Sequence, residues 1–337
     1  MRTAILLVGF STVALAAAPQ APPGGQIQVQ VNVVNVPVTV TDAEERFVMD
    51  LDKADFRVWE DGKPVEVRYF TRDPKQPLVV GFILDASNTA RLYVKTYQEA
   101  ITDLAWTLLP SGEGNRGFLA AYHTQVDFLV KPTSDTEQIV EKIRKLKPGG
   151  GAALLDAVHQ ACTKYFTVKG APNEPKRVLV VVGDGHDNAS TVSLDQALEA
   201  AQRAQVVIYA VSTVAYGFTN EGEANLVRLA EETGGRIERP LQKVHTKVSG
   251  YLSTPSDEGN YAYKVGTGQY AAELSGKIYK AITDISGDVT HQYVLGYTSP
   301  TPFTDRKFRS IKVELKDPGL KIRARKGYYP VPAERAP

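Results

Sequence analysis

The chain has 337 residues, enough for a sizeable hydrophobic core and for more than one domain. Its 39 basic and 38 acidic side chains give a formal net charge of +1, which indicates neither a polyanionic partner nor a charged disordered tail. The single cysteine, Cys162, excludes a metal site built from several thiolates. Scattered lysines without interleaved aromatic residues argue against nucleic-acid binding.

The first 18 residues have the pattern of a secretory signal peptide. A charged start at Met1-Arg-Thr is followed by an apolar run from Ala4 to Leu15 and by small residues up to Ala18. That run is shorter than the roughly 20 residues that a membrane-spanning helix needs, and no later segment is apolar enough to span. We therefore expect an exported protein, periplasmic or extracellular, with residues 1–18 removed and 19–26 left as a linker.

Residues 27–74 read as an N-terminal β segment. Ile27 to Thr41 alternates apolar and polar residues, and Pro37 places this strand at a sheet edge or marks a break in it. Phe56 to Glu60 and Val65 to Phe70 flank the turn Asp61-Gly62, which predicts a hairpin.

From Pro77 the pattern changes to strands that alternate with helices. This alternation predicts a doubly wound, mostly parallel (Rossmann-like) α/β sheet over residues 77–286. The predicted strands are 77–84, 116–121, 126–130, 177–182, 206–212 and 236–238, and the predicted helices are 93–109, 135–146, 153–166, 194–204, 225–233 and 270–285. Residues 240–268 have no clear period and are expected to form a mobile or a binding loop.

Residues 290–329 return to β structure. Strands are predicted at His291 to Tyr297, Lys307 to Leu315 and Lys321 to Arg325. Neither β segment has enough residues for a core of its own. We therefore expect the two segments to pack together as a small β-sandwich, with the α/β domain inserted between them.

Polar residues follow the two most apolar strands. Asp85, Ser87 and Thr89 come after the first, and Asp184 comes after the strand 177–182. Ligands of open α/β sheets bind beyond the carboxyl ends of the strands, where these side chains meet. Carboxylate and hydroxyl oxygens suit Mg²⁺ or Mn²⁺ better than Zn²⁺. Taken alone, residues 85–89 favour the alternative that Asp and Ser at the strand end cap the next helix.

A third loop, Gly149 to Asp156, completes a specific resemblance. Asp-x-Ser-x-Thr, this glycine-rich loop and the aspartate after a third strand resemble a von Willebrand factor type A domain in order and spacing over about residues 77–286. The flanking segments, with Phe56-x-Val-x-Glu-Asp-Gly and Arg323-Ala-Arg-Lys-Gly-Tyr-Tyr, resemble bacterial exported proteins described as related to this domain.

The resemblance implies a metal-ion-dependent adhesion site. Asp85 and Asp184 would be its acidic ligands and Ser87 and Thr89 its hydroxyl ligands to Mg²⁺ or Mn²⁺, and a partner's carboxylate would complete the coordination. The chain departs from the family pattern at Ala152, where the family has a threonine ligand, so that a water would have to fill this position. Gly183 also replaces a residue that often carries a hydroxyl.

The resemblance implies a protein-binding or adhesion module and not an enzyme. No Gly-x-Ser-x-Gly motif, phosphate loop or zinc pattern around His123, His159 or His186 is present. No nucleic acid, small-molecule cofactor or membrane span is expected. The alternative is a metal-independent interaction module with a vestigial site, which would bind through residues 240–268 or through the β segments.

Overall fold

The structure, a computed structural model, describes residues 33–73, 76–92, 94–110, 114–168, 174–214, 221–242 and 267–330, without the side chains of residues 92, 96 and 267–271. The predicted signal peptide, the linker and most of the segment 240–268 lie outside the described residues. No helix in the described part of the chain is long and apolar enough to cross a membrane.

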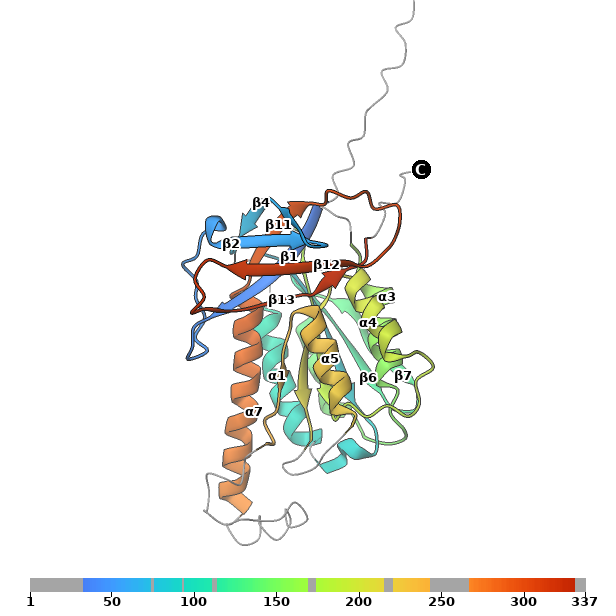
Figure 1. The fold of residues 1–337 in the computed structure, drawn as a ribbon. Coiled ribbons are helices and arrows are strands. Elements are labelled where there is room, and N and C mark those ends of the chain that lie inside the picture. Colours follow the sequence, from blue (N-terminus) through green and yellow to red (C-terminus); the bar gives the residue numbers. More distant parts are fainter. Residues whose placement is uncertain are drawn as a thin grey trace, which may run out of the picture. The chain divides into compact units, whose positions relative to one another are not determined.

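Strands and helices follow one another largely as predicted (Figure 1). The strands are β1 (Val33–Thr41), β2 (Phe56–Glu60), β3 (Lys63–Val65), β4 (Val67–Thr71), β5 (Leu78–Asp85), β6 (Arg116–Tyr122), β7 (Val126–Thr133), β8 (Lys176–Gly183), β9 (Val207–Ser212), β10 (Ile237–Glu238), β11 (Tyr293–Thr298), β12 (Arg309–Leu315), β13 (Lys321–Ala324) and β14 (Gly327–Tyr328). The helices are α1 (Val94–Leu108), α2 (Thr136–Lys145), α3 (Leu154–Tyr165), α4 (Leu194–Arg203), α5 (Glu223–Thr233) and α7 (Thr267–Thr290), with short 3-10 turns η1 (Lys53–Asp55) and η2 (Thr89–Leu92).

The central sheet has the strand order β10-β9-β8-β5-β6-β7. All neighbours pair in parallel except β7, which runs antiparallel to β6. The continuous apolar runs of β5 and β8 are buried on both faces, as such strands are in a covered parallel sheet. Helices α1, α2 and α7 cover one face and α3, α4 and α5 the other. The predicted α/β fold class is confirmed.

Two antiparallel sheets, β13-β1-β11-β4 and β14-β12-β2-β3, share a separate hydrophobic core. Their strands come from both ends of the chain, since β1 pairs with β11 and β2 pairs with β12. This pairing is the small β-sandwich that the sequence predicts, and the α/β sheet is inserted between its halves. Within β1, pairing with β11 continues through Pro37, whereas pairing with β13 begins only at Val38. The proline therefore marks the point where β1 changes from an edge strand to an inner strand.

The predicted hairpin is wrong in its second strand. Only Lys63–Val65 (β3) pairs with β2, while Val67–Thr71 (β4) pairs with β11 in the other sheet. The chain crosses between the sheets at the exposed Glu66, after which Val67 and Phe70 pack against the core of the sandwich. Strands that switch sheets in this way form the corners of sandwiches.

A buried carboxylate, Glu60, connects the strands of the sandwich. It is 1% exposed and accepts hydrogen bonds from the hydroxyls of Tyr297 at 2.7 Å, Ser299 at 2.7 Å and Tyr328 at 2.9 Å. The guanidinium of Arg309 lies 3.9 Å from Glu60 and donates to Ser299 at 2.8 Å. A buried charge is tolerated only when it is paired and hydrogen-bonded in this way.

Replacing Glu60 with alanine should therefore destabilise the protein strongly. The substitution removes the acceptor of the Tyr297 and Tyr328 hydroxyls and the negative charge that faces the buried Arg309. Removing one partner of a buried ion pair costs about 3–5 kcal/mol. The free energy of unfolding, measured by urea denaturation, reports the change. The exposed Glu66→Ala is the control and should change stability by less than about 0.5 kcal/mol. Equal stabilities of the two variants would show that the Glu60 network does not stabilise the sandwich.

Candidate functional site

The carboxyl ends of β5, β6 and β8 meet at one edge of the central sheet. Asp85, the last residue of β5, lies opposite Tyr122, the last residue of β6. On the other side of β5, Leu84 pairs with Val182, so that β8 ends at Gly183 and the chain continues directly into Asp184. Strand pairing therefore brings the aspartates that the sequence predicts as ligands to neighbouring strands at the same edge.

The loop after β5 is held tightly by hydrogen bonds. The Asp85 Oδ1 accepts the backbone N–H of Ser87 at 2.7 Å, and the hydroxyls of Ser87 and Thr89 lie 2.8 Å apart. The backbone N–H of Ala86 donates to the carbonyl of Tyr122 at 2.9 Å, which fixes the loop to β6. Asp85 and Ser87 are buried, with 6% and 2% of their surface exposed. The structure thus brings together the oxygen atoms of the predicted Asp-x-Ser-x-Thr motif.

The glycine-rich loop packs against this motif through its backbone. Gly149 donates to the carbonyl of Ala86 at 2.7 Å, and Asn88 donates to the carbonyl of Gly150 at 3.2 Å. Gly150 has φ = +86°, and a Cβ added there would lie 2.8 Å from the Thr124 hydroxyl. That hydroxyl accepts the N–H of Gly151 at 3.0 Å. Both the backbone conformation and the close approach therefore require glycine at position 150.

Ala152 lies where the resemblance places a threonine ligand. It is 3% exposed, and its N–H donates to the Asn188 side-chain oxygen at 2.8 Å. Its carbonyl accepts the backbone N–H groups of Asn188 at 2.9 Å and Ala189 at 3.0 Å. The loop is thus firmly placed beside the third loop, but the side chain of residue 152 brings no oxygen.

The third loop contributes Asp184 and caps helix α3. The Asp184 Oδ1 accepts the N–H of His186 at 2.9 Å. Asp187 accepts the N–H of Leu155 at 2.8 Å and the Ser190 hydroxyl at 2.6 Å, so it stabilises the first turn of α3. Turn and cap chemistry therefore accounts for Asp187, as it does for the Asn188 oxygen bound to Ala152.

The electrostatics at Asp85 favour a cation. Burial raises the pKa of Asp85, and the nearby negative Asp184 raises it further, while the hydrogen bonds from Ser87 oppose both effects. The Asp85 Oδ2 is buried without a hydrogen-bond partner. A divalent cation at this point would satisfy that oxygen and would offset the repulsion between the two carboxylates.

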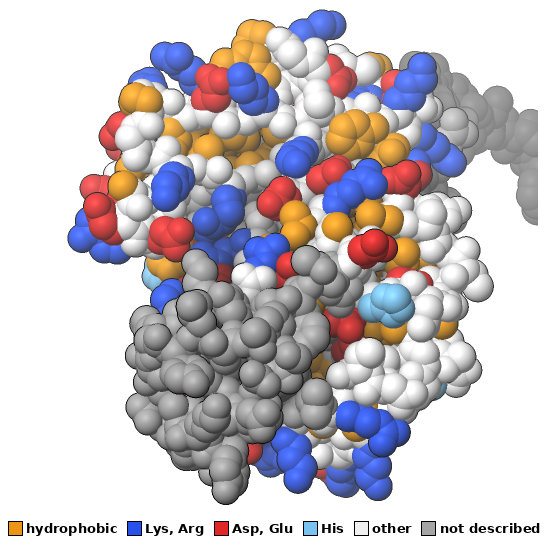
Figure 2. Space-filling view, turned by 60° about the horizontal axis from the view of Figure 1, so that its bottom comes forward, with side chains coloured by type: hydrophobic (Ala, Val, Ile, Leu, Met, Phe, Trp, Pro, Cys, Tyr) orange, Lys and Arg blue, Asp and Glu red, His pale blue; other side chains and the backbone are white. Residues whose placement is uncertain are grey.

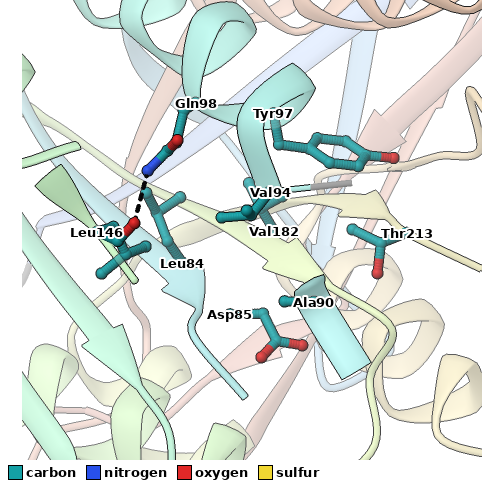
Figure 3. Close-up of a pocket in the computed structure, with 9 residues that line it drawn as sticks. All are labelled: Leu84, Asp85, Ala90, Val94, Tyr97, Gln98, Leu146, Val182 and Thr213. Carbon is teal, nitrogen blue, oxygen red and sulfur yellow. Dashed lines mark hydrogen bonds between the residues drawn. The ribbon is translucent and has the colours of Figure 1, made fainter. Parts of the chain in front are cut away.

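The surroundings of Asp85 are apolar on the side of helix α1. A small pocket there is lined mainly by aliphatic and aromatic side chains (Figure 3). The residues that line it are Leu84, Asp85, Ala90, Val94, Tyr97, Gln98, Leu146, Val182 and Thr213. Gln98 is held at the pocket wall because its side-chain amide donates to the carbonyl of Leu146 at 2.9 Å. Charges interact more strongly beside such a low-dielectric region than in water.

The oxygen atoms of the three loops suit a hard cation, although residue 152 contributes none. Among the described residues, no three or more His, Cys, Asp or Glu side chains gather closely enough to hold a metal. The candidate donors are instead two carboxylates and two hydroxyls, which suit Mg²⁺ or Mn²⁺. Cys162 is buried on α3, and burial raises its thiol pKa, as expected for an inert cysteine.

Two residues of the site escaped prediction from the sequence. Tyr122 is fully buried and its hydroxyl lies next to Asp85, although the two do not meet the geometry of a hydrogen bond. Thr124 orders the glycine-rich loop through Gly151. Both follow the apolar core of β6, and no motif distinguishes them from ordinary residues at a strand end.

The chain is similar to one protein family and to several solved structures. Residues 80–246 match the family model of the von Willebrand factor type A domain. The solved structure of proximal thread matrix protein 1 from the mussel byssus, with a zinc-occupied adhesion-site motif, is similar at 15% identity and a TM-score of 0.47, over 68% of this chain and 50% of that one. This chain therefore spans about half the length of the mussel protein.

BatB from Bacteroides thetaiotaomicron is similar at 14% identity and a TM-score of 0.39, over 61% of this chain and 99% of that one. An aerotolerance-related membrane protein from Bacteroides fragilis is similar at 16% identity and a TM-score of 0.38, over 58% and 99%. No curated protein matches the sequence. The family model thus identifies residues 80–246, which span the central sheet and the three loops described above, as matching a von Willebrand factor type A domain.

Proposed function

We propose that this chain is an exported, non-enzymatic protein-binding module. Asp85, Ser87, Thr89 and Asp184 would hold Mg²⁺ or Mn²⁺, and the ion would bind a carboxylate group of a partner protein. The export part of the proposal rests on the signal-peptide pattern of residues 1–18. The family assignment supports an interaction module.

One observation supports the metal site above all others. The Asp85 carboxylate is buried at the edge of the sheet with one oxygen lacking a partner, while the Ser87 and Thr89 hydroxyls lie 2.8 Å apart in the loop that follows it. Burying an unpaired carboxylate oxygen is unfavourable. Binding of a hard cation would convert this unfavourable arrangement into a satisfied one.

The site supports the capture of an external acid group. Mg²⁺ prefers octahedral coordination, and the side chains of the proposed set do not fill every position. Ala152 leaves one further position to water. The vacant positions would then accept a carboxylate from a partner, whose negative charge the ion attracts.

The molecular surface agrees with a local contact of this kind. Figure 2 shows acidic and basic side chains interspersed over the visible face, with hydrophobic side chains scattered among them. The formal net charge of the chain is only +1. Recognition through one ion therefore fits this chain better than recognition by a broad charged surface.

A second candidate function is a metal-independent interaction module. The observation that favours it is the methyl side chain of Ala152 at the position of a ligand, together with the firm backbone hydrogen bonds that hold it there. In this case the loops would retain their structure without an ion. The two candidates differ in whether the folded protein binds a divalent cation.

Thermal unfolding distinguishes the two candidates. Millimolar Mg²⁺ or Mn²⁺ should raise the melting temperature relative to chelator, because a ligand at 100 times its Kd stabilises the folded state by about 2.7 kcal/mol. Asp184→Ala should abolish this shift. Asp103→Ala, which removes an exposed carboxylate on α1, should retain it. No shift for the wild-type chain would favour the metal-independent module.

Restoring the missing oxygen should strengthen binding. Ala152→Thr adds a hydroxyl at the position of the family ligand, and we expect Kd for Mn²⁺ to fall by about tenfold, or ~1.4 kcal/mol. Ala152→Val is the matched control, because it has the same shape without the hydroxyl. Isothermal titration calorimetry measures both. Equal affinities of the Thr and Val variants would show that residue 152 does not face the ion.

Partner binding should depend on the same ion. A protein captured from the native host by the immobilised chain in Mn²⁺ should be released by chelator and should not bind Asp184→Ala. Asp103→Ala should capture it normally. Changing the partner's contacting Asp or Glu to Asn or Gln should abolish capture, since an amide carries no charge to attract the ion. Capture that resists both chelator and Asp184→Ala would contradict the proposed mode of binding.

A further inference from the structure

We propose that Tyr122 is a positioning residue for the metal site, whose hydroxyl donates to the Asp85 Oδ2 and holds this carboxylate toward the ion. The inference rests on the proposed function and adds to it a residue from β6. It follows from the positions of Tyr122, Asp85 and Gly183 at the ends of three adjacent strands.

Two buried oxygen atoms at this edge of the sheet lack hydrogen-bond partners. Tyr122 is 0% exposed and its hydroxyl has no hydrogen-bond partner. Asp85 is 6% exposed, and its Oδ2 also has no partner, while its Oδ1 is occupied by the N–H of Ser87. Leaving a donor and an acceptor buried and unpaired is unfavourable. A small movement that joins the two oxygens is therefore favourable.

Gly183 leaves space for the Tyr122 hydroxyl beside Asp85. A Cβ added to Gly183 would lie 2.0 Å from the Tyr122 hydroxyl and 3.2 Å from the Asp85 Oδ2. The phenol oxygen therefore occupies the space that any side chain at position 183 would fill. The structure thus explains why β8 ends in glycine, and it places a hydroxyl from β6 beside the ligand on β5.

The phenol of Tyr122 and the carboxylate of Asp85 are complementary as hydrogen-bond donor and acceptor. A phenol has one O–H donor, and a carboxylate accepts hydrogen bonds at both oxygens. Each carboxylate oxygen has two lone pairs, so Oδ2 can accept the Tyr122 O–H and still bind the cation. With Ser87 N–H on Oδ1 and Tyr122 O–H on Oδ2, rotation of the carboxylate is restricted. Groups that orient metal ligands in this way typically change metal affinity by about 10–100-fold.

The alternative role of Tyr122 is purely structural. Its side chain belongs to the hydrophobic core that the sheet shares with α3, α4 and α5, so that a substitution could act through stability alone. Tyr209 provides a matched control. It is also fully buried on the central sheet, but its hydroxyl accepts a hydrogen bond from Gln292 at 3.0 Å, and it lies in the core on the other face of the sheet.

The test is Mn²⁺ titration of the full chain by calorimetry, with melting temperatures in chelator measured in parallel. Tyr122→Phe removes only the hydroxyl and should raise Kd for Mn²⁺ by about 10-fold or more. Tyr209→Phe should leave Kd unchanged. Gly183→Ala should also raise Kd, because its methyl group displaces the phenol oxygen. The double variant Tyr122→Phe/Gly183→Ala should bind no more weakly than Gly183→Ala alone, because phenylalanine leaves no oxygen in the space of the added methyl group, which also lies close to the Asp85 Cβ.

The outcomes separate this inference from the proposed function. Wild-type affinity in Tyr122→Phe would overturn the role of Tyr122 and leave the metal site intact. An equal loss of affinity in Tyr122→Phe and Tyr209→Phe would overturn it too, because the effect would then follow stability. Absence of Mn²⁺ binding by the wild-type chain would overturn the proposed function and the Tyr122 inference together.

Discussion

Parallel pairing of β5 with β6 on one side and β8 on the other determines the positions of the functional residues. Because β5 is apolar along its length and buried on both faces, its register is fixed by the cores on either side. That register places Asp85 opposite Tyr122 and next to the end of β8. A slip of one residue would turn the Asp85 side chain toward α1 and away from Gly183. The positions of the polar groups at the carboxyl end of the sheet therefore depend on how the aliphatic side chains of β5 pack in the two cores.

The inserted α/β sheet and the β-sandwich are also joined by polar contacts. Asp288, near the end of α7, is fully buried and accepts a hydrogen bond from Arg323 of β13 at 2.6 Å. The N–H of Lys326, which follows β13, donates to the carbonyl of Glu232 in α5 at 3.2 Å. Removing the partner of a buried charge such as Asp288 is costly. These contacts connect the sandwich to helices α5 and α7 of the inserted domain. Glu60 connects the strands within the sandwich.

The sequence was sufficient for features that depend on local pattern. The strands β5 and β8 follow from their apolar runs, and the aspartates after them follow from the rule that ligands bind at the carboxyl ends of strands. The division of Val65 to Phe70 between two sheets was missed, because alternation describes a strand but not its partner. Tyr122 was missed for a similar reason. A buried tyrosine at a strand end is common in sequences. Only the structure shows that its hydroxyl fills the space that a side chain at Gly183 would occupy.

The account as a whole depends on oxygen atoms from separate loops that meet around one hard cation. Asp85 would supply a buried, oriented carboxylate, Ser87 and Thr89 neutral hydroxyls, and Asp184 the second charge, while Ala152 would make the site weaker than a fully equipped one. The most direct measurement is the anomalous difference density of a crystal soaked in Mn²⁺. The account predicts a peak within coordination distance of the Asp85, Ser87 and Thr89 side-chain oxygens and close to Asp184. A well-ordered site without such a peak would contradict it.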